Sequence, residues 1–180
     1  MAIRHAAAVL RAGGVVAYPT EGVYGLGCIA DDEAAVRRIL RIKRRDWSMG
    51  LVVIVSELGQ IRAWTSLPPG VERLESTDAL PLTWILPATG DAPPWIRGRH
   101  DGLAVRQTTH PVARALCRAT DSALVSTSAN LSGHPPVRNR FVLRRLFGRL
   151  VDYIVPGELG PASGPSEIRN LGTGQVLRPA

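Results

Sequence analysis

The feature that most constrains the fold is a run of five apolar residues without polar alternation, LVVIV at residues 51–55. Successive side chains of a strand point to opposite faces of a sheet, so a strand with one face in water alternates apolar and polar residues. Residues 51–55 therefore predict a strand that is covered on both faces. Sheets of this kind have helices packed on each side.

The other predicted elements place helices between short apolar strands along the whole chain. We expect helices at residues 3–12, 61–74 in part, 110–117 and 142–150, and a further helix that is capped by Asp31 or Asp32 and runs into residues 43–45. Strands are expected at residues 15–18, 51–55, 82–86, 103–106, 123–125, 153–155 and 175–178. Residues 20–27 are predicted to be a glycine-rich loop, and a hairpin is predicted to turn at residues 172–174. This irregular order favours the α/β class, with residues 1–180 as a single domain on an open, twisted, mixed sheet with flanking helices.

Composition excludes several classes of protein. Of the 180 residues 45% are hydrophobic and 21% charged, which is ordinary for a globular chain. No apolar run is long enough to span a bilayer, so we expect a cytoplasmic protein without a membrane partner. Cys28 and Cys117 form no CxxC pair and the four histidines match no metal spacing, so no metal site is predicted. The net charge of +7 favours anionic partners, such as nucleotides or RNA.

The segment STSANLSG, residues 126–133, follows the predicted strand at residues 123–125. Serine and asparagine are common in caps and turns, and this is the simpler interpretation. The density of hydroxyl and amide groups favours a second interpretation, because hydroxyls and exposed backbone N–H groups donate to anionic oxygens. The segment therefore predicts a site for a polar or phosphorylated small molecule.

Two further segments have both a structural and a functional interpretation. Lys43, Arg44 and Arg45 end a predicted helix, where basic residues complement the helix dipole but can also bind phosphates. Arg106 lies on a short apolar strand and needs an anionic partner, which can be a structural carboxylate or a substrate carboxylate. The glycines of residues 22–27 read GxxGxG, which is the wrong order for a dinucleotide fingerprint, and GxxxxGK[ST] is absent.

Taken together, the motifs resemble the YrdC/TsaC family of L-threonylcarbamoyladenylate synthases. They are PTEGVYGLG (19–27), KRR (43–45) followed by GLVVIV (50–55), LAVR (103–106), HP (110–111), STSANLSG (126–133) and PSEIR (165–169). The combination of Lys43-x-Arg45 with Ser128-x-Asn130 is more specific than either part. The resemblance covers residues 14–178 and implies the short bacterial form, an open YrdC-like fold with a concave, basic cavity.

The resemblance implies an enzyme, a nucleotidyltransferase that makes threonylcarbamoyl-AMP and pyrophosphate from L-threonine, bicarbonate and ATP. Other proteins, a threonylcarbamoyl transferase complex, then use the product to form N6-threonylcarbamoyladenosine in tRNA. ATP is thus implied as a substrate, with Mg²⁺ accompanying it and no tightly bound cofactor, and tRNA as a further partner.

The resemblance also implies roles for individual residues. Those expected to bind L-threonine are Thr20, Arg106, Ser126 and Ser166, and those expected to bind the nucleotide are Lys43, Arg45, Ser128, Asn130 and Arg178. Lys43 and Arg45 are the implied catalytic residues because they face the phosphates of ATP. No dedicated general base is evident.

Three positions depart from the family pattern. The family often has Lys or Asn where Met49 stands, and Trp-Pro-Gly-Pro where residues 78–81 read DALP; some members have His where Ile54 stands. The first departure predicts the loss of one nucleotide contact. The first two together leave room for weaker activity or a diverged role.

The principal alternative is a non-catalytic module of the same fold that binds tRNA or double-stranded RNA. Two basic groups favour it, residues 37–45 and the arginines at 138, 140, 144, 145 and 149, but only 5% of the residues are aromatic. Charge that lines a cavity favours the enzyme, whereas a broad exposed stripe favours RNA binding. A relative that uses carbamoyl phosphate, as in hydrogenase-maturation carbamoyltransferases, is disfavoured because Cys-rich segments are absent.

Overall fold

The computed structural model describes residues 1–69, 71, 74 and 76–179. The strands of this part of the chain form a four-stranded sheet of order β7-β2-β1-β8 and a six-stranded sheet of order β10-β9-β4-β5-β3-β6. Their bounds are β1 (Val16–Pro19), β2 (Tyr24–Gly27), β3 (Val53–Val55), β4 (Leu82–Pro87), β5 (Gly102–Gln107), β6 (Leu124–Val125), β7 (Thr127–Ser128), β8 (Tyr153–Ile154), β9 (Glu167–Asn170) and β10 (Val176–Arg178). Both sheets are mixed: β1–β8, β3–β5 and β4–β9 are parallel, and the remaining pairs are antiparallel.

The two sheets meet along residues 123–128, a segment we call the seam. Its first part, β6, pairs with β3 of the larger sheet, and its last part, β7, pairs with β2 of the smaller one. The seam also bonds to the chain after β2, since Val125 N donates to Cys28 O at 2.9 Å and Ala30 N donates to Ala123 O at 3.0 Å. A side chain on the seam therefore lies where both sheets end.

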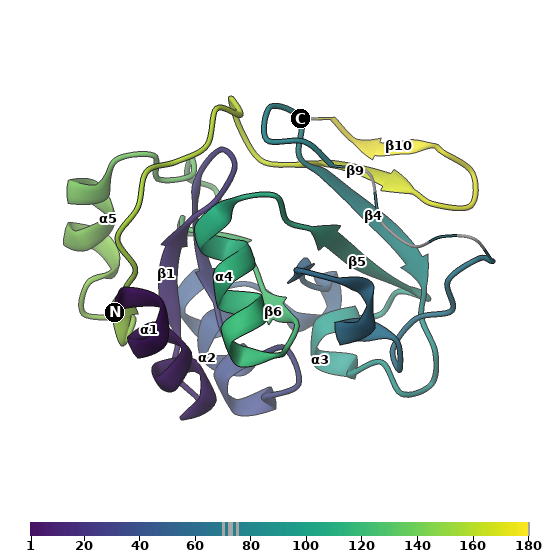
Figure 1. Cartoon of the computed structure of the whole chain (residues 1–180), viewed down its shortest axis with the longest axis horizontal. Coiled ribbons are helices and arrows are strands. Elements are labelled where there is room, and N and C mark those ends of the chain that lie inside the picture. The colour runs from purple at the N-terminus through teal and green to yellow at the C-terminus, as the bar shows by residue number, and fades with distance from the viewer. Residues whose placement is uncertain (70, 72–73, 75, 180) are drawn as a thin grey trace.

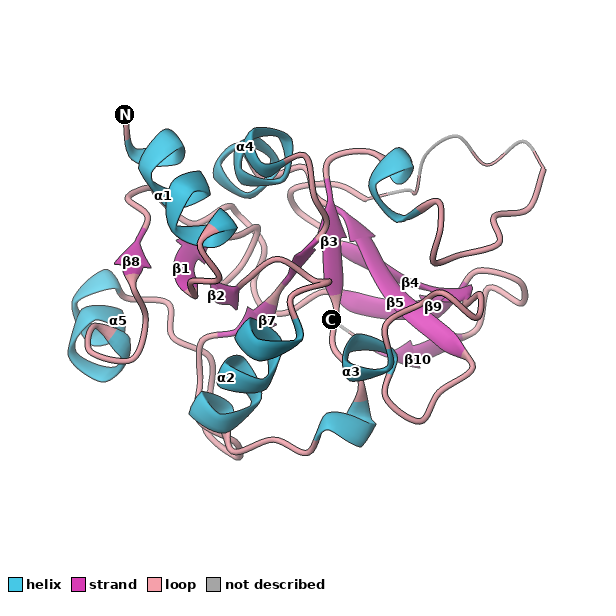
Figure 2. Ribbon diagram, turned by 90° about the horizontal axis from the view of Figure 1, so that it is seen from below, coloured by secondary structure: helices cyan, strands magenta, loops and turns pink. Residues whose placement is uncertain are grey.

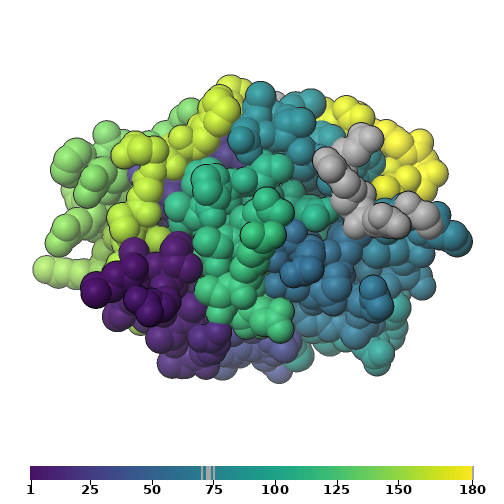
Figure 3. All heavy atoms as spheres, viewed as in Figure 1, coloured from purple at the N-terminus to yellow at the C-terminus, as the bar shows by residue number. Residues whose placement is uncertain are grey.

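Helices cover both faces of the sheets, as Figures 1 and 2 show. The helices are α1 (Ala2–Arg11), α2 (Glu33–Lys43), α3 (Pro94–Arg97), α4 (Pro111–Thr120) and α5 (Arg140–Phe147), with 3₁₀ turns η1 (Trp47–Met49) and η2 (Leu58–Ile61). Helices α1 and α4 lie side by side on one face, which Figure 3 shows in space-filling form, and α2 and α3 lie on the other. None of the described helices has the length and hydropathy needed to span a bilayer.

The prediction for residues 51–55 is confirmed, although the strand is shorter. Val53 and Val55 point into the hydrophobic cluster that includes α2, whereas Ile54 points into the cluster of α1 and α4. All three side chains are fully buried. Apolar residues at every position are therefore required because each face of β3 contacts a helical layer.

Two sequence predictions about local structure are wrong. Residues 20–27 are not one loop, because Tyr24–Gly27 is a strand that pairs with β1 and β7. Gly27 is in that strand because a Cβ there would lie 2.5 Å from Val125 O and 2.7 Å from Tyr18 Cε1, so glycine marks a close approach of chains.

The second wrong prediction concerns residues 61–74, which were expected to be partly helical. The 3₁₀ turn η2 ends at Ile61, and residues 62–69 contain no helix. Thr65 instead makes a β-bridge with Ala88, and Pro68 and Pro69 follow. Residues 70 and 72–73 of this prediction lie outside the described part of the chain.

Helices α1, α2, α4 and α5 begin and end close to the predicted residues, whereas α3 was not predicted. Asp32 caps α2, accepting from Ala35 N at 3.0 Å, and Pro111 opens α4 directly after His110. The C-terminal hairpin β9–β10 also forms as predicted. Cys28 and Cys117 are free, buried thiols.

Candidate functional site

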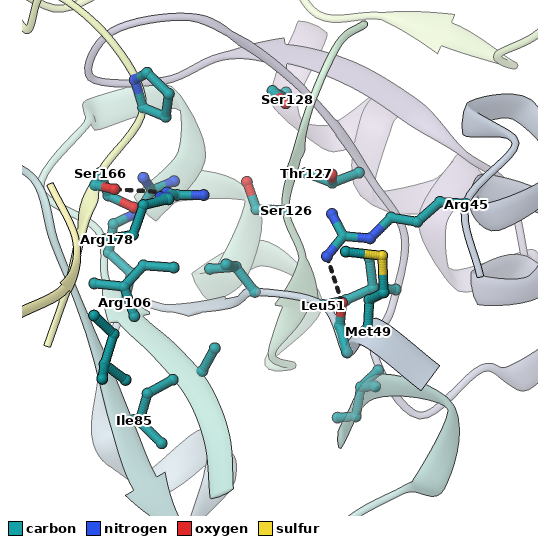
Figure 4. Close-up of a pocket in the computed structure, with 18 of the residues that line it drawn as sticks. Arg45, Met49, Leu51, Ile85, Arg106, Ser126, Thr127, Ser128, Ser166 and Arg178 are labelled. Carbon is teal, nitrogen blue, oxygen red and sulfur yellow. Dashed lines mark hydrogen bonds between the residues drawn. The ribbon is translucent and has the colours of Figure 1, made fainter. Parts of the chain in front are cut away.

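A cavity of about 370 Å³ opens beside the seam, between the two sheets (Figure 4). Its walls come from the β1–β2 turn, the chain between α2 and β3, strands β4 and β5, the seam, and the C-terminal hairpin. Seven of the nine predicted site residues line it: Thr20, Arg45, Arg106, Ser126, Ser128, Ser166 and Arg178. Segments far apart in the sequence are therefore brought to one place.

The hydroxyls of the seam lie at the middle of this cavity in Figure 4. Ser126 stands between β6 and β7, and its N–H donates to Val52 O at 2.8 Å, which fixes its backbone against the neighbouring strand. Opposite it, Gly25 leaves room, because a Cβ there would lie 3.3 Å from Thr20 Cγ2 and 3.4 Å from Ser126 Oγ. The serine-rich segment is thus part of a cavity wall rather than an isolated turn.

Arg106 has a structural carboxylate partner and also faces the cavity. Its Nη2 lies 3.6 Å from Glu21 Oε2, and its Nε has no hydrogen-bond partner. Glu21 Oε1 accepts from Thr108 Oγ1 at 2.6 Å and from Thr109 N at 3.2 Å. Burial alone raises the pKa of Glu21, but Arg106 and these hydrogen bonds outweigh it, so the pKa is lowered. Arg106 can therefore serve both a structural carboxylate, Glu21, and a substrate carboxylate, because its Nε–H remains without a partner.

Ser166 and Arg178 enter the cavity from the C-terminal hairpin. Ser166 Oγ lies 2.6 Å from Thr83 Oγ1 on the neighbouring strand β4, and Arg178 Nη2 donates to Ser166 O at 2.6 Å. Burial, and then repulsion from Arg106 and Arg45, lower the pKa of Arg178. Figure 4 shows Arg178 and Arg106 on one side of the cavity and Arg45 on the other.

A strap, residues 156–166, runs from the smaller sheet to the larger one and holds the β1–β2 turn (Figure 1). Its amides donate to that turn, from Gly160 N to Thr20 O at 3.0 Å and from Ala162 N to Glu21 O at 2.9 Å. Arg138, from beyond the seam, donates to Ala162 O at 3.1 Å and to Ser163 O at 2.6 Å. The turn that carries Thr20 is therefore fixed from outside the cavity.

Lys43 and Asn130 do not line the cavity. The Lys43 ammonium is buried and donates to Ser128 O, to Asn130 O at 3.1 Å and to Asn130 Oδ1 at 2.7 Å. Burial, and then the nearby charge of Arg45, lower the pKa of Lys43 to about 8. In this structure Lys43 fixes the loop that follows β7, so it lies directly behind Ser128.

Arg45 lies on the wall opposite Arg106. Its Nη2 donates to Gly50 O at 2.9 Å, its Nε is buried without a partner, and burial lowers its pKa. The left-handed backbone of Arg44, with φ of 52°, separates the directions taken by Lys43 and Arg45. The two neighbouring cations therefore serve different walls.

Sequence reasoning missed Arg97 and His100, which also line the cavity. Both lie between β4 and β5, in a polar segment rich in proline and glycine whose sequence contains no motif that indicates a site. With them, the described lining residues include four arginines (Arg45, Arg97, Arg106 and Arg178) and no carboxylate. Such a surface attracts anions, and arginine forks bind carboxylate and phosphate oxygens.

The second basic group lies on a different surface. Arg140, Arg144, Arg145 and Arg149 are exposed on and after α5, and the first two line a separate hollow of about 340 Å³. Charge is therefore present both in the cavity and on an exposed face. The described residues contain no cluster of three or more His, Cys, Asp or Glu side chains that could hold a metal ion.

Comparison with known sequences gives a consistent result. The family model Sua5_yciO_yrdC, described as telomere recombination, matches residues 8–180. A protein of Nitrosococcus oceani named threonylcarbamoyl-AMP synthase is 52% identical, covering 98% of this chain and 96% of its own length. A protein of Xanthomonas euvesicatoria with the same name is 48% identical, covering 96% of this chain and 95% of its own length.

Solved structures share the fold. Sua5 of P. abyssi complexed with L-threonine has a TM-score of 0.88 and 32% identity over 98% of this chain, which spans about half (53%) of that chain. YciO of E. coli has a TM-score of 0.82 and 26% identity, covering 98% of this chain and 88% of that chain. Full-length HypF, with a TM-score of 0.82 and 22% identity over 97% of this chain and 28% of that chain, shares the fold alone.

Proposed function

Because the chain belongs to the Sua5/YciO/YrdC family, we propose that its cavity makes threonylcarbamoyl-AMP and pyrophosphate from L-threonine, bicarbonate and ATP. This reaction serves the formation of N6-threonylcarbamoyladenosine in tRNA. The observation that carries the proposal is the cavity lining, with four arginines and no carboxylate among its described residues. Threonine carboxylate, bicarbonate and triphosphate are all anions, so a cationic cavity allows them to be bound together.

We propose that L-threonine binds on the side of Arg106, with its carboxylate on that guanidinium. Ser126 and Ser166 line the cavity near it, as Figure 4 shows, and Thr20 lies near Ser126 on either side of Gly25. Their hydroxyls are proposed to bind the remaining polar groups. Support comes from the unpartnered Nε of Arg106, because a buried N–H without a partner costs stability that a substrate oxygen recovers.

The nucleotide is assigned to Arg45, Ser128 and Arg178, with Asn130 and Lys43 holding the loop behind Ser128. Arg45 is our proposed catalytic residue at the phosphates. Lys43, whose ammonium bonds to Ser128 O and to Asn130, is proposed to act behind it as a positioning residue. Mg²⁺ enters with ATP as substrate, and phosphate oxygens and water supply its ligands, since the described lining offers no carboxylate.

The proposed chemistry has two steps. Bicarbonate loses hydroxide to give CO₂, and the neutral threonine amine attacks its carbon, so that a C–N bond forms while one C–O π pair moves to oxygen. The amine proton passes to the hydroxide as water, which leaves a carbamate. A carbamate oxygen then attacks the α-phosphorus of ATP, the bond from that phosphorus to the bridging oxygen breaks, and pyrophosphate leaves. The arginines stabilise the negative charge on the leaving group, and binding in one cavity removes the entropy cost of bringing the substrates together.

Pyrophosphate release by the purified protein tests the proposal. We expect release with MgATP, bicarbonate and L-threonine together, with threonylcarbamoyl-AMP detected by mass, and little release when threonine or bicarbonate is omitted. Arg45→Ala and Arg106→Ala are expected to lose turnover or affinity. Normal kinetics in both variants would show that the site assignment is wrong.

We also propose that the exposed arginines of α5 contact tRNA, which the downstream transferase complex modifies with the labile product. Arg140, Arg144 and Arg145 are exposed, and no carboxylate within the described residues pairs with them. Changing all three to Gln is expected to weaken tRNA binding and to reduce its salt dependence. Pyrophosphate release without tRNA should not change. Equal tRNA affinity and equal salt dependence in the variant would refute this contact.

A further inference from the structure

Arg97 is a cavity cation that no expectation above includes. It is the last residue of α3 and lines the cavity, and its Nη1 donates to His100 O at 2.8 Å. Its Nε is buried and has no hydrogen-bond partner, and no described carboxylate forms an ion pair with it. A buried N–H donor without a partner is costly. The guanidinium that carries it is only half-buried, so an anion in the cavity can reach it.

The position of Arg97 is fixed by the chain that carries Arg45. Leu51 N donates to Ile96 O at 2.8 Å, and Arg99 N donates to Ser48 O at 3.0 Å, on either side of Arg97. Two glycines permit this approach.

A Cβ on Gly50 would lie 2.8 Å from Arg97 O, and one on Gly98 would lie 2.4 Å from Ser48 O. Both glycines have positive φ, 63° and 69°. Arg45 and Arg97 thus belong to one rigid wall, because Arg45 bonds to Gly50 O.

Met49 also lines the cavity, and it lies in the segment 48–51 that bonds to the chain on either side of Arg97. The Met49 side chain is 61% exposed and carries no charge. Beside Arg45, the second cation of this wall is therefore Arg97 at the end of α3, because the residue at position 49 is uncharged.

We propose that Arg97 is a further phosphate-binding residue, which with Arg45 holds the β- and γ-phosphates of ATP and the pyrophosphate product. The inference rests on the proposed function, because it assigns a ligand group to the same cavity. Two guanidinium groups on one rigid wall match a diphosphate, which offers oxygens on two adjacent phosphorus atoms.

Calorimetric titration with pyrophosphate, and separately with ATP, tests the assignment without turnover. Arg97→Gln should weaken pyrophosphate binding by about 10- to 100-fold, the loss typical of a charged hydrogen-bonding group. The KM for ATP should rise while the KM for L-threonine stays within about twofold of the wild-type value. The matched control is Arg99→Gln, since Arg99 lies 6.0 Å over the Trp47 ring and outside the cavity lining, and it should bind pyrophosphate as the wild type does.

A second variant separates a binding role from a structural one. Met49→Lys introduced into Arg97→Gln returns a cation to the same wall and should recover most of the pyrophosphate affinity. Unchanged pyrophosphate affinity in Arg97→Gln overturns the inference, and so does an equal loss of threonine affinity that Met49→Lys does not correct. Failure of the proposed function looks different: the wild-type protein binds pyrophosphate but releases none from ATP with threonine and bicarbonate.

Discussion

Lys43 ends α2, and Arg45 lies two residues further along the chain. Because Arg44 between them has a left-handed backbone, the side chains of Lys43 and Arg45 point in different directions. Lys43 bonds to the loop after β7, and Arg45 bonds to the wall shared with Arg97. At the scale of residues, the site is therefore a set of cations, from the buried Lys43 to the exposed Arg178, held by main-chain and amide oxygens. Their mutual repulsion is tolerated because anions are the expected ligands.

The pKa of Lys43 reports this repulsion. Burial and Arg45 both disfavour the charged ammonium and lower the pKa to about 8. Arg45→Gln removes the neighbouring positive charge, so the pKa of Lys43 should rise above that of the wild type. NMR titration of the Lys43 side chain, without ligand, measures it. An unchanged or lower pKa in the variant would mean that Arg45 does not act on Lys43.

Arg106→Gln should raise the KM for L-threonine by about 10- to 100-fold, because it removes the charged partner of the substrate carboxylate. The KM for ATP should change less, since Arg45, the proposed phosphate contact, stands on the opposite wall and Arg178 beside Arg106 keeps its charge. Steady-state pyrophosphate release measures both constants. Arg118→Gln, an exposed position on α4, serves as the control. A rise in the KM for ATP alone would place threonine elsewhere.

At the scale of elements, β2 decides the shape of the site. Strand β2 pairs with β1 on one side and with β7 on the other. Its glycines therefore allow the seam to lie close to the antiparallel pair β1–β2. Sequence reasoning took this strand for a loop because glycines at positions 25 and 27 read as turn residues. Their actual role is to make room for Tyr18, Val125 O and Ser126, which lie elsewhere in the sequence.

Gly27→Ala should lower the free energy of unfolding by about 1–3 kcal/mol, the usual effect of added volume in a packed interior. The new methyl group would meet a backbone oxygen at 2.5 Å, which cannot rotate away. Gly90→Ala is the matched control, since nothing lies within 4 Å of its Cβ position, and it should change stability by less than about 0.5 kcal/mol. Urea unfolding measures both. Equal stabilities of the two variants would contradict the close packing of β2 against the seam.

The sequence allowed most elements to be predicted because their signals are local. A cap at Asp31 or Asp32, the helix start at Pro111 after His110 and the full burial of Ile54 follow from short patterns, and the structure selects Asp32 as the cap. The site was predictable only through the order of its motifs. Arg97 could not be found in this way, because its value depends on contacts with residues 48–51, which are remote in the chain.

At the scale of the whole molecule, Glu21 joins the two sheets. It lies in the β1–β2 turn of the smaller sheet and binds Arg106 and Thr108, on and just after β5 of the larger one. Its main-chain oxygen also accepts from Ala162 of the strap. One buried residue thus connects three parts of the fold around the cavity, because its carboxylate binds the β5 region and its main-chain oxygen binds the strap.

The stability of the protein should depend on the ionisation of Glu21. Because its pKa is lower in the folded protein than in the unfolded chain, its contribution is present above the ordinary glutamate pKa and is lost as the pH falls through the folded value. Glu21→Gln should lower the free energy of unfolding at pH about 7 by about 1–3 kcal/mol. The difference from the wild type should shrink in acid, as unfolding curves at pH about 7 and about 3.5 measure. A constant difference at both pH values would mean that the charge of Glu21 is not what stabilises the fold.

The glycine strand has a consequence for inhibitors. Gly25 contributes only main-chain atoms to the cavity, and an added methyl group would crowd Thr20 and Ser126 at 3.3 and 3.4 Å. A compound that binds to this strand contacts main-chain atoms, which a mutation does not remove. A larger residue at position 25 that excludes the compound also narrows the space proposed for the amino acid substrate. Drug resistance by substitution at Gly25 should therefore carry a loss of fitness, whereas compounds that depend on the Met49 side chain should select resistant variants readily.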